Sequence, residues 1–269
     1  MAIEIRHHTG HVLFRAVRAH DLRGALTEAR NAKIDLSGAM LEGADLRSSD
    51  LEQIKLDGAK LARASLRHSN LEEASLVGAD LTGARMDGAN LEEASLEGAI
   101  LVDANLRGSN LEEAMLARAN LTNAAVDGTN MEHADLREAV LEQANFARSN
   151  LEHAQMRGIK ARGASFSSAN LEKADLRDAD LTAIGATSAN LEKCDMRGAK
   201  LVDAVLAGSN LEKADLRGAD LTNADLTESN LERCDFHDAR IEGTRFDNAN
   251  LDGVRGMDRM KPPPSGPYR

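Results

Sequence analysis

The chain has 269 residues, a formal net charge of −11, two cysteines and 2% aromatic residues. No apolar run approaches the length of a signal peptide or a transmembrane helix, which excludes a membrane-spanning class and makes the cytoplasm the expected compartment. So few aromatic residues indicate a core too narrow for large rings. We expect no direct binding to nucleic acid or to a membrane.

The N-terminal segment predicts a β-hairpin followed by a helix. Ile3 to Arg6 and Val12 to Arg15 have the pattern of two strands on either side of Thr9-Gly10. Residues 21 to 32 place apolar side chains at helical spacing, namely Leu22, Ala25, Leu26 and Ala29. We expect the hairpin and the amphipathic helix to cover the first strands of the next element, because unpaired strand edges invite aggregation.

A five-residue repeat follows. Leucine, or a residue in its place, returns every five positions from Leu36 to Leu251, and a small residue stands two positions before nearly every one. The count is 44 pentapeptides without an insertion. We call the leucine site the central position, the site two before it the inward small position, and the site two after it the turn position. A period of five fits neither a helix nor an ordinary strand and predicts a repeat architecture.

A second period of 20 residues lies over the first, as expected if each turn of the chain has four sides. Residues 20 apart then stack in one column, and aligned asparagine amides can bond along the axis. The asparagine column is Asn70, Asn90, Asn110, Asn130, Asn150, Asn170, Asn190, Asn210, Asn230 and Asn250. A glutamate column follows at Glu52, Glu72, Glu92, Glu112, Glu132, Glu152, Glu172, Glu192, Glu212 and Glu232. We call this side the first face and the next pentapeptide along the chain the second face.

The pattern Ala-(Asp/Asn)-Leu-x-x resembles that of the pentapeptide-repeat family over about four fifths of the chain. The resemblance implies an all-β solenoid, a right-handed quadrilateral parallel β-helix. Four pentapeptides per turn make about 11 coils, roughly 53 Å in length at about 4.8 Å per coil. The N-terminal hairpin and helix are similar to the small α+β cap of many bacterial and phage members. We therefore expect a cap at residues 1–33, the β-helix at 34–256 and a Pro-rich disordered tail at 257–269.

The repeat also predicts how the core packs. Central and inward small positions would alternate large and small side chains. Two exchanges of a large for a small residue occur at Ile159/Ala161 and at Ile184/Ala186, and each roughly conserves volume. Of the 21 glycines, 16 occupy the turn position, where a corner needs a permissive backbone. Cys194 and Cys234 replace the inward alanine two coils apart, about 10 Å and beyond disulfide reach, so we expect buried thiols with a packing role.

The C-terminal end of the repeat differs from the rest. Phe236 and Phe246 enlarge the last coils. All four prolines lie beyond the repeats, as expected if the coils need their backbone donors. No helix is evident after the last coil, so this end is closed either by Met257 and Met260 or by another subunit in a homodimer. The sequence leaves both alternatives open.

The usual signatures of an enzyme are missing, since there is no nucleophile elbow, no phosphate-binding glycine loop and no paired CxxC. We therefore expect no catalytic residue, no cofactor and no metal site. His133 and His153 share one outward position beside Glu132 and Glu152 and could in principle bind a metal, but a gradient of charge explains them better. A further histidine group lies around the hairpin turn, at His7, His8 and His11.

The outward column that contains His133 and His153 changes charge along the chain. It runs Glu73, Glu93, Glu113, His133, His153, Lys173, Lys193, Lys213 and Arg233. Residues 34–144 carry a net charge of −12 and residues 145–256 one of −4. In the C-terminal half of the repeat, basic residues stand beside the glutamates of the first face. In the N-terminal half these glutamates have no such neighbours, and like charges about 5 Å apart should repel one another. The candidate partner-binding acidic face is Glu72, Glu73, Glu92, Glu93, Glu112 and Glu113.

Two functions are consistent with these features. The first is a non-enzymatic protein–protein interaction scaffold or adaptor, a rigid rod whose acidic half docks a protein partner. The alternative is DNA mimicry directed at DNA gyrase or topoisomerase, because gyrase-binding members of the family resemble duplex DNA in shape and charge. The chain lacks the projecting loops and the C-terminal dimerisation helix of those members, which favours the scaffold. A third explanation is that the glutamates only keep the rod soluble.

Overall fold

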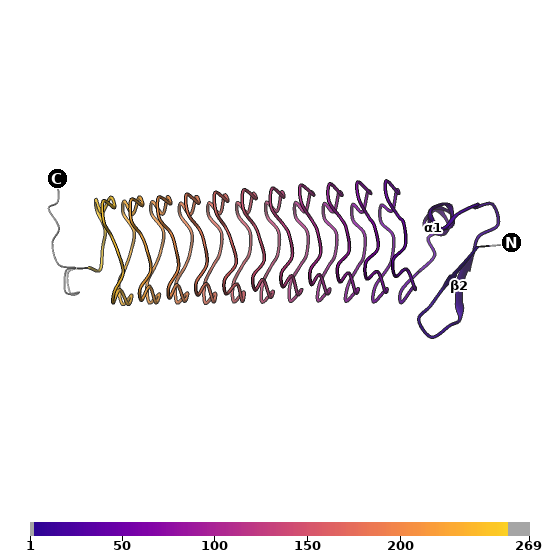
Figure 1. Cartoon of the computed structure of the whole chain (residues 1–269), viewed down its shortest axis with the longest axis horizontal. Helices are drawn as coiled ribbons and strands as arrows, with labels where there is room; N and C mark the ends of the chain where they lie inside the picture. Colours follow the sequence, from indigo (N-terminus) through magenta and orange to yellow (C-terminus); the bar gives the residue numbers. More distant parts are fainter. Residues whose placement is uncertain (1–2, 258–269) are drawn as a thin grey trace.

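The computed structural model describes residues 3–257 and shows a rod with a cap at its N-terminal end (Figure 1). Three regular elements precede the coils, namely strand β1 (Glu4–Arg6), strand β2 (Val12–Arg15) and helix α1 (Leu22–Asn31). The predicted strands and helix are confirmed to within one residue at each end. None of the helices in the described part of the chain is long and apolar enough to cross a membrane.

The cap has a glycine in the turn of its hairpin and an aspartate at the start of its helix. Strands β1 and β2 pair antiparallel, with Ile5 opposite Phe14, and Gly10 adopts a φ of +98° in the connecting turn, where L residues are strained. Asp21 caps α1, since its Oδ1 accepts a hydrogen bond from the Gly24 N–H at 2.8 Å. The helix buries Ala25, Leu26 and Ala29, which is the face predicted from their spacing.

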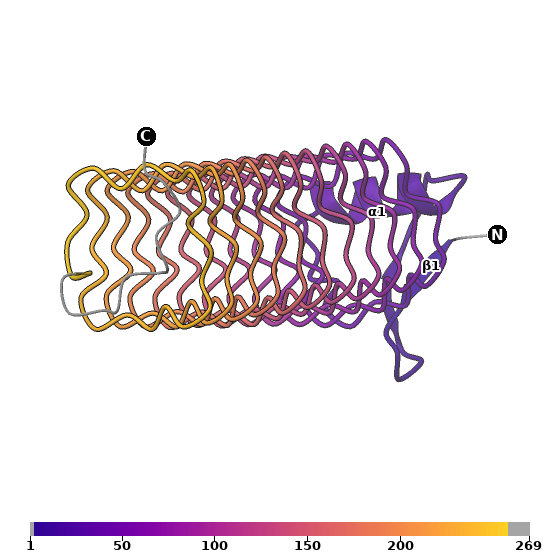
Figure 2. The same ribbon diagram turned by 60° about the vertical axis from the view of Figure 1, so that its left-hand side comes forward.

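The hairpin is attached to the first coil by backbone hydrogen bonds. The Met40 N–H donates to the Arg6 carbonyl at 2.8 Å, and the His8 N–H donates to the Gly38 carbonyl at 3.0 Å. Figure 2 shows the hairpin and α1 together at the N-terminal end of the rod. The cap therefore covers part of the first strand edge, as the sequence predicted.

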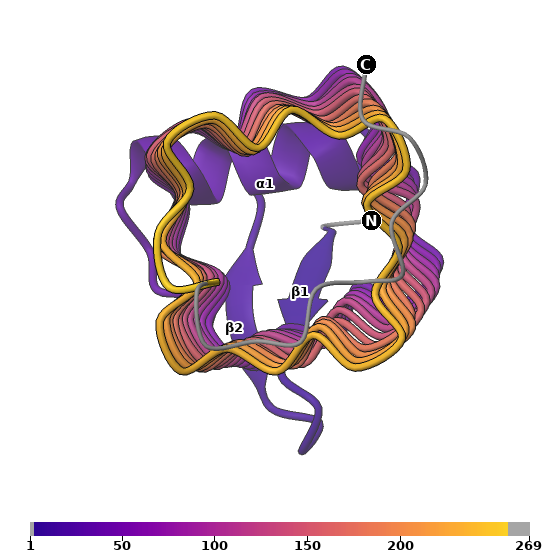
Figure 3. The same cartoon turned by 90° about the vertical axis from the view of Figure 1, so that its left-hand side faces the viewer.

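The coils form a right-handed, four-sided parallel β-helix, and Figure 3 shows its square outline along the axis. Every fifth residue from Asp35 to Asp235 pairs in parallel with the residue 20 positions later. Within each pentapeptide the central and turn N–H groups donate to the next coil, as Leu71 does to Asn90 (2.7 Å) and Glu73 does to Glu92 (2.9 Å). The predicted fold and its register are confirmed.

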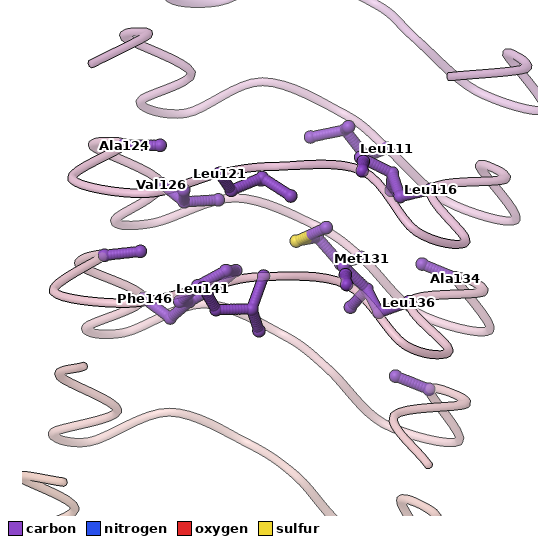
Figure 4. Close-up of a cluster of buried hydrophobic side chains, with 14 of the residues drawn as sticks. Leu111, Leu116, Leu121, Ala124, Val126, Met131, Ala134, Leu136, Leu141 and Phe146 are labelled. Carbon is purple, nitrogen blue, oxygen red and sulfur yellow. The ribbon is translucent and has the colours of Figure 1, made fainter. Parts of the chain in front are cut away.

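Central and inward small residues fill the tube. Figure 4 shows Leu111, Leu116, Met131 and Leu136 pointing into the interior from two successive coils, and all four are buried. The exchanged residues are buried too, with Ile159, Ala161, Ile184 and Ala186 each at most 4% exposed. Ile184 and Ala186 are among the residues that line a small apolar void of about 10 Å³ in the core.

The turn position is left-handed throughout the repeats, as its glycines predicted. All 16 of these glycines have positive φ, and so do non-glycine residues at the same position, including Glu93 at +54°. At Gly88 a side chain would also displace a neighbouring one. A Cβ on Gly88 would lie 2.4 Å from His68 Nδ1.

The last coil is partly open within the described residues. Phe236 is buried and meets Phe246 edge to face, with ring centroids 6.3 Å apart. Phe246 and Met257 are only partly buried against the core. Met257 thus covers some of this end, whereas Met260 and the predicted Pro-rich tail from residue 258 on lie outside the described residues. The boundaries between cap, β-helix and tail stay predictions.

Candidate interaction surface

The ten asparagines of the first face form one continuous ladder. Each Nδ2 donates to the Oδ1 of the asparagine one coil earlier, at distances from 2.9 to 3.2 Å between Asn70 and Asn250. The same Oδ1 accepts from the backbone two residues on, as Asn90 does from the Glu92 N–H at 3.4 Å. The ladder therefore stiffens the first face and fixes the direction of the side chains beside it.

The glutamates next to this ladder accept hydrogen bonds from its amides in the N-terminal half. From Asn90 to Asn170 the amide nitrogen also donates to the glutamate of the previous coil, so Glu72, Glu92 and Glu112 accept at 3.0, 3.1 and 3.0 Å. All three are half-buried. As expected, none of the three forms an ion pair with a described residue, and their partners are neutral amides instead. The spacing of 18 residues from glutamate to asparagine was the available signal.

The outer glutamates Glu73, Glu93 and Glu113 are exposed at the turn position. Glu73 accepts from Gln53 Nε2 at 3.0 Å, and none of the three forms an ion pair with any residue between 3 and 257. The backbone holds them in the left-handed region, with φ of +53°, +54° and +55°. The six residues of the predicted acidic face thus separate into an inner column bonded to the asparagine ladder and an outer, free column, where free means without an ion pair to a described residue.

Basic residues take over the outer column in the C-terminal half. Lys173 lies 3.0 Å from Glu172 and 3.3 Å from Glu152, and Lys193 lies 2.6 Å from Glu192. Hydrogen bonding from Lys173 lowers the pKa of the Glu172 carboxyl, and the two carboxylates raise the pKa of Lys173. The inner glutamates of the first face therefore change partner along the rod, from asparagine amides in the N-terminal half to lysine ammonium groups in the C-terminal half.

Two stacked histidines lie where the outer column changes from glutamate to lysine. The rings of His133 and His153 are 4.9 Å apart and inclined by 10°, and their Nε2 atoms lie 3.9 and 3.6 Å from Glu132 and Glu152. In the described part of the chain no three histidine, cysteine or acidic residues are grouped so as to hold a metal ion. The His7 ring stacks on that of His11 with centroids 4.6 Å apart, and its centroid lies 3.9 Å from that of the tilted His8 ring. Burial, followed by the charges of its two neighbours, lowers the pKa of His7.

The second face neutralises its own charges. Arg177 and Arg197 bind the aspartates two residues before them with both N–H groups, at 2.5 to 2.7 Å. Arg177 also lies 3.6 Å from Asp195 of the next coil. Hydrogen bonds from Arg177 hold the pKa of the Asp175 carboxyl below its ordinary value. This face therefore presents paired charges, in contrast to the outer glutamates of the first face.

The two cysteines are buried in the core and show no sign of reactivity. Their thiols donate to the carbonyls of Leu171 and Leu211, at 2.8 and 2.9 Å. Burial raises the pKa of the Cys194 thiol and raises that of Cys234 to about 12. A thiol that stays protonated is a poor nucleophile. Neither of the two cysteines forms a disulfide.

Comparison with known proteins agrees with the geometry of the coils. The family model for pentapeptide repeats matches in eight copies, over residues 26–124, 127–182 and 187–253. The structure of HetL, a pentapeptide repeat protein involved in heterocyst differentiation regulation from the cyanobacterium Nostoc sp. strain PCC 7120, is 28% identical and has a TM-score of 0.55. That match covers 87% of this chain and 97% of HetL.

Two further solved structures are less similar. QnrB1, a plasmid-mediated fluoroquinolone resistance protein, is 24% identical with a TM-score of 0.34, and the match covers 62% of this chain and 83% of QnrB1. A pentapeptide repeat protein of the Arabidopsis thaliana thylakoid lumen is 32% identical over 36% of this chain and 65% of that protein, with a TM-score of 0.26. No significant match to the chain was found among curated proteins.

Proposed function

Because the chain belongs to the pentapeptide repeat family, we propose that it is a non-enzymatic interaction scaffold whose outer glutamates dock a basic protein partner. The observation that carries the proposal is the free column of Glu73, Glu93 and Glu113. These carboxylates are exposed, aligned and without cations, whereas the same column in the C-terminal half consists of lysines paired with the inner glutamates. A partner would therefore find an aligned column of unpaired carboxylates on the N-terminal half of the first face.

The spacing of the column suits an electrostatic docking surface. Carboxylates one coil apart are about 4.8 Å from each other, and their mutual repulsion is relieved when a cation binds between them. The rigid backbone holds them in place beforehand, so little conformational entropy is lost on association. The inner glutamates Glu72, Glu92 and Glu112 support the surface, because their bonds to the asparagine ladder direct them along the face.

The test is an affinity pull-down from a bacterial lysate, with the full chain as bait and the captured proteins identified by mass spectrometry. A triple variant with Glu73, Glu93 and Glu113 changed to Gln should lose the partner that the native rod captures. The matched control changes three other exposed acidic turn residues, Asp103 and Asp238 to Asn and Glu228 to Gln, and should retain it. Equal capture by both variants would contradict the proposed surface.

A second candidate is DNA mimicry directed at DNA gyrase or topoisomerase, which the overall charge favours. The solenoid carries a net charge of −16, about one charge per 3.3 Å of rod and near half the density of duplex DNA. Gyrase or topoisomerase subunits among the captured proteins, lost as salt rises, would support this candidate over a scaffold for another partner. A partner unrelated to DNA would exclude it.

A further inference from the structure

On the first face, the first coil lacks the preceding strand that the later coils have. On the first face, the Asn70 N–H donates to the Ser49 carbonyl at 2.9 Å, and the Asn70 carbonyl accepts from the Leu51 N–H at 2.7 Å. The Glu72 carbonyl accepts from the Gln53 N–H at 2.8 Å. Three backbone groups of each first-face strand are thus satisfied by the coil before it.

The corresponding groups at the start of the first face have no such partner. They are the N–H and carbonyl of Asp50 and the carbonyl of Glu52. Lys33 lies 20 residues before Gln53, so in the repeat its N–H would donate to the Glu52 carbonyl. Residues 32 to 34 instead follow directly on the end of α1, and the Lys33 N–H donates to the Arg30 carbonyl at 2.8 Å. No group within residues 3–257 hydrogen-bonds to these three, so the edge of one strand is open.

A cavity of about 500 Å³ begins at Glu52, at one end of this edge, and lies between the end of α1 and the first face. The volume is within the range of protein sites that bind small ligands, about 300 to 1,000 Å³. Its lining includes Ile54, which is buried, and Ile34, which is partly buried against the core. The cavity therefore combines unpaired backbone groups with an apolar floor.

The rim of the cavity is basic. Arg30, Lys33 and Lys55 line it, with Glu52 as the acidic lining residue. Arg30 is already paired with Asp50 at 2.5 Å, whereas Lys33 and Lys55 form no ion pair with any described residue. The two lysines leave an excess of positive charge in a chain that is acidic elsewhere. A ligand that fits this cavity has an extended backbone, negative charge and an apolar side chain for the floor.

We propose that this cavity binds a short, extended acidic peptide, which pairs in parallel with Asp50 to Glu52 as the missing strand of the first face. Strand addition satisfies the three open backbone groups, and pockets beside the edge select the side chains. Carboxylates of the peptide face Lys33 and Lys55, and an apolar side chain covers Ile34. The site is independent of the outer glutamates, since it has the opposite charge and a different partner chemistry.

The probe is the hexapeptide Glu-Val-Glu-Val-Glu-Val, acetylated at its N-terminus and amidated at its C-terminus, titrated into the ¹⁵N-labelled full chain. We expect a saturable shift of the Asp50 amide signal, with a Kd on the order of 1 mM or below. Changing Lys33 and Lys55 to Gln should raise this Kd by about fivefold or more. Changing Lys160 and Lys200, two lysines of a distant face, to Gln is the matched control and should leave the Kd unchanged.

Backbone pairing is tested with the same hexapeptide N-methylated at alternate residues, in its two registers. In an added strand only alternate N–H groups point to the edge. One methylated register should therefore bind like the parent, and the other should lose binding by about tenfold or more. Equal binding of the two methylated peptides would show that charge attraction alone, without strand addition, accounts for binding, and it would overturn the proposal. An Asp50 amide unaffected by any of these peptides, or indifference to the Lys33 and Lys55 changes, would overturn it as well.

Discussion

In the pentapeptides with Asp or Asn before the central position, that side chain supplies an acceptor that the backbone lacks. The other N–H groups of the pentapeptide find backbone carbonyls in the same or a neighbouring coil. The N–H that follows the central residue has none, and it donates to a side-chain oxygen, as Thr122 does to Asn120 (3.0 Å) and Arg177 does to Asp175 (3.2 Å). Aspartate and asparagine are common before the leucine because their oxygen closes this local turn.

The central leucine is equally specific for its site. Leu176 is 1% exposed and packs in the core column. We predict that Leu176→Asp lowers the thermal transition strongly and removes the native β circular dichroism of several coils, because a buried unpaired carboxylate costs several kcal/mol. Leu176→Met nearly conserves volume and should cost less than about 1.5 kcal/mol. A stable Leu176→Asp variant with the native spectrum would contradict the assigned register.

Among the side-chain columns, the asparagine ladder is the one in which each residue bonds to both neighbours. Asn110 donates to Asn90 Oδ1 at 3.2 Å and to Glu92 Oε2 at 3.1 Å, and it accepts from Asn130 at 3.1 Å. A carboxylate in its place keeps the acceptor and loses both donors. An aspartate tolerated elsewhere in the repeat is therefore unsuitable here.

We predict that Asn110→Asp destabilises the rod by about 1 to 3 kcal/mol, because two acceptors lose their donor and meet a negative charge. The control is Asn120→Asp on a neighbouring side of the coil. Asn120 binds Thr122 as Asp180 binds Thr182, with both hydroxyl contacts at 2.6 Å, so Asn120→Asp should be nearly neutral. Chemical denaturation of the two variants measures the difference, and equal losses would show that the ladder contributes no specific stability.

The aspartates of the second face make the coils sensitive to acid. The pKa of Asp175 lies below its ordinary value of 3.8, chiefly through hydrogen bonds from Arg177. A carboxyl with a lowered folded pKa stabilises the fold above its unfolded pKa, and that contribution disappears as the pH falls through the folded pKa. The transition temperature should therefore be flat from pH 7 to about 5 and fall below about pH 4.

Arg177→Gln should lower the transition temperature slightly at pH 7 and should reduce the further loss below pH 4, since the Asp175 carboxyl then titrates nearer its unfolded value. Arg63→Gln removes an exposed ion pair with Glu42 instead, and such pairs contribute about 1 kcal/mol or less. Its pH profile should match that of the native chain. If the transition temperature of Arg177→Gln fell below pH 4 as steeply as that of the native chain, other carboxyls would be responsible for the acid sensitivity.

Over the whole molecule, charge is unequally compensated along the rod. The outer glutamates at one end are free, whereas the C-terminal half pairs its glutamates with lysines and its aspartates with arginines. Each coil contacts only its neighbours, so the repulsion is not relieved by distant parts of the chain. The acidic end is therefore expected to respond to ionic strength more than the other end does.

We predict that changing Glu73, Glu93 and Glu113 to Gln raises the transition temperature at about 10 mM salt, where the screening length is near 30 Å, and has little effect at about 1 M salt. The control variant of Asp103, Glu228 and Asp238 removes as many charges from separate sites and should show a smaller gain. Differential scanning calorimetry across salt concentrations compares the two. A gain that persists at high salt would show that relief of charge repulsion is not its cause.

The sequence by itself determined the fold, the register, the buried columns and the asparagine ladder, because a strict period of five within a period of 20 fixes which residues stack once four sides close a turn. It also located the outer glutamates and their change to lysine. The tertiary structure decided which glutamates are free, since only the placed asparagine amides show that Glu72, Glu92 and Glu112 already have partners. It likewise decided where the strand edge stays open, because the end of α1 meets Asp50 and Lys55 through packing that no repeat encodes.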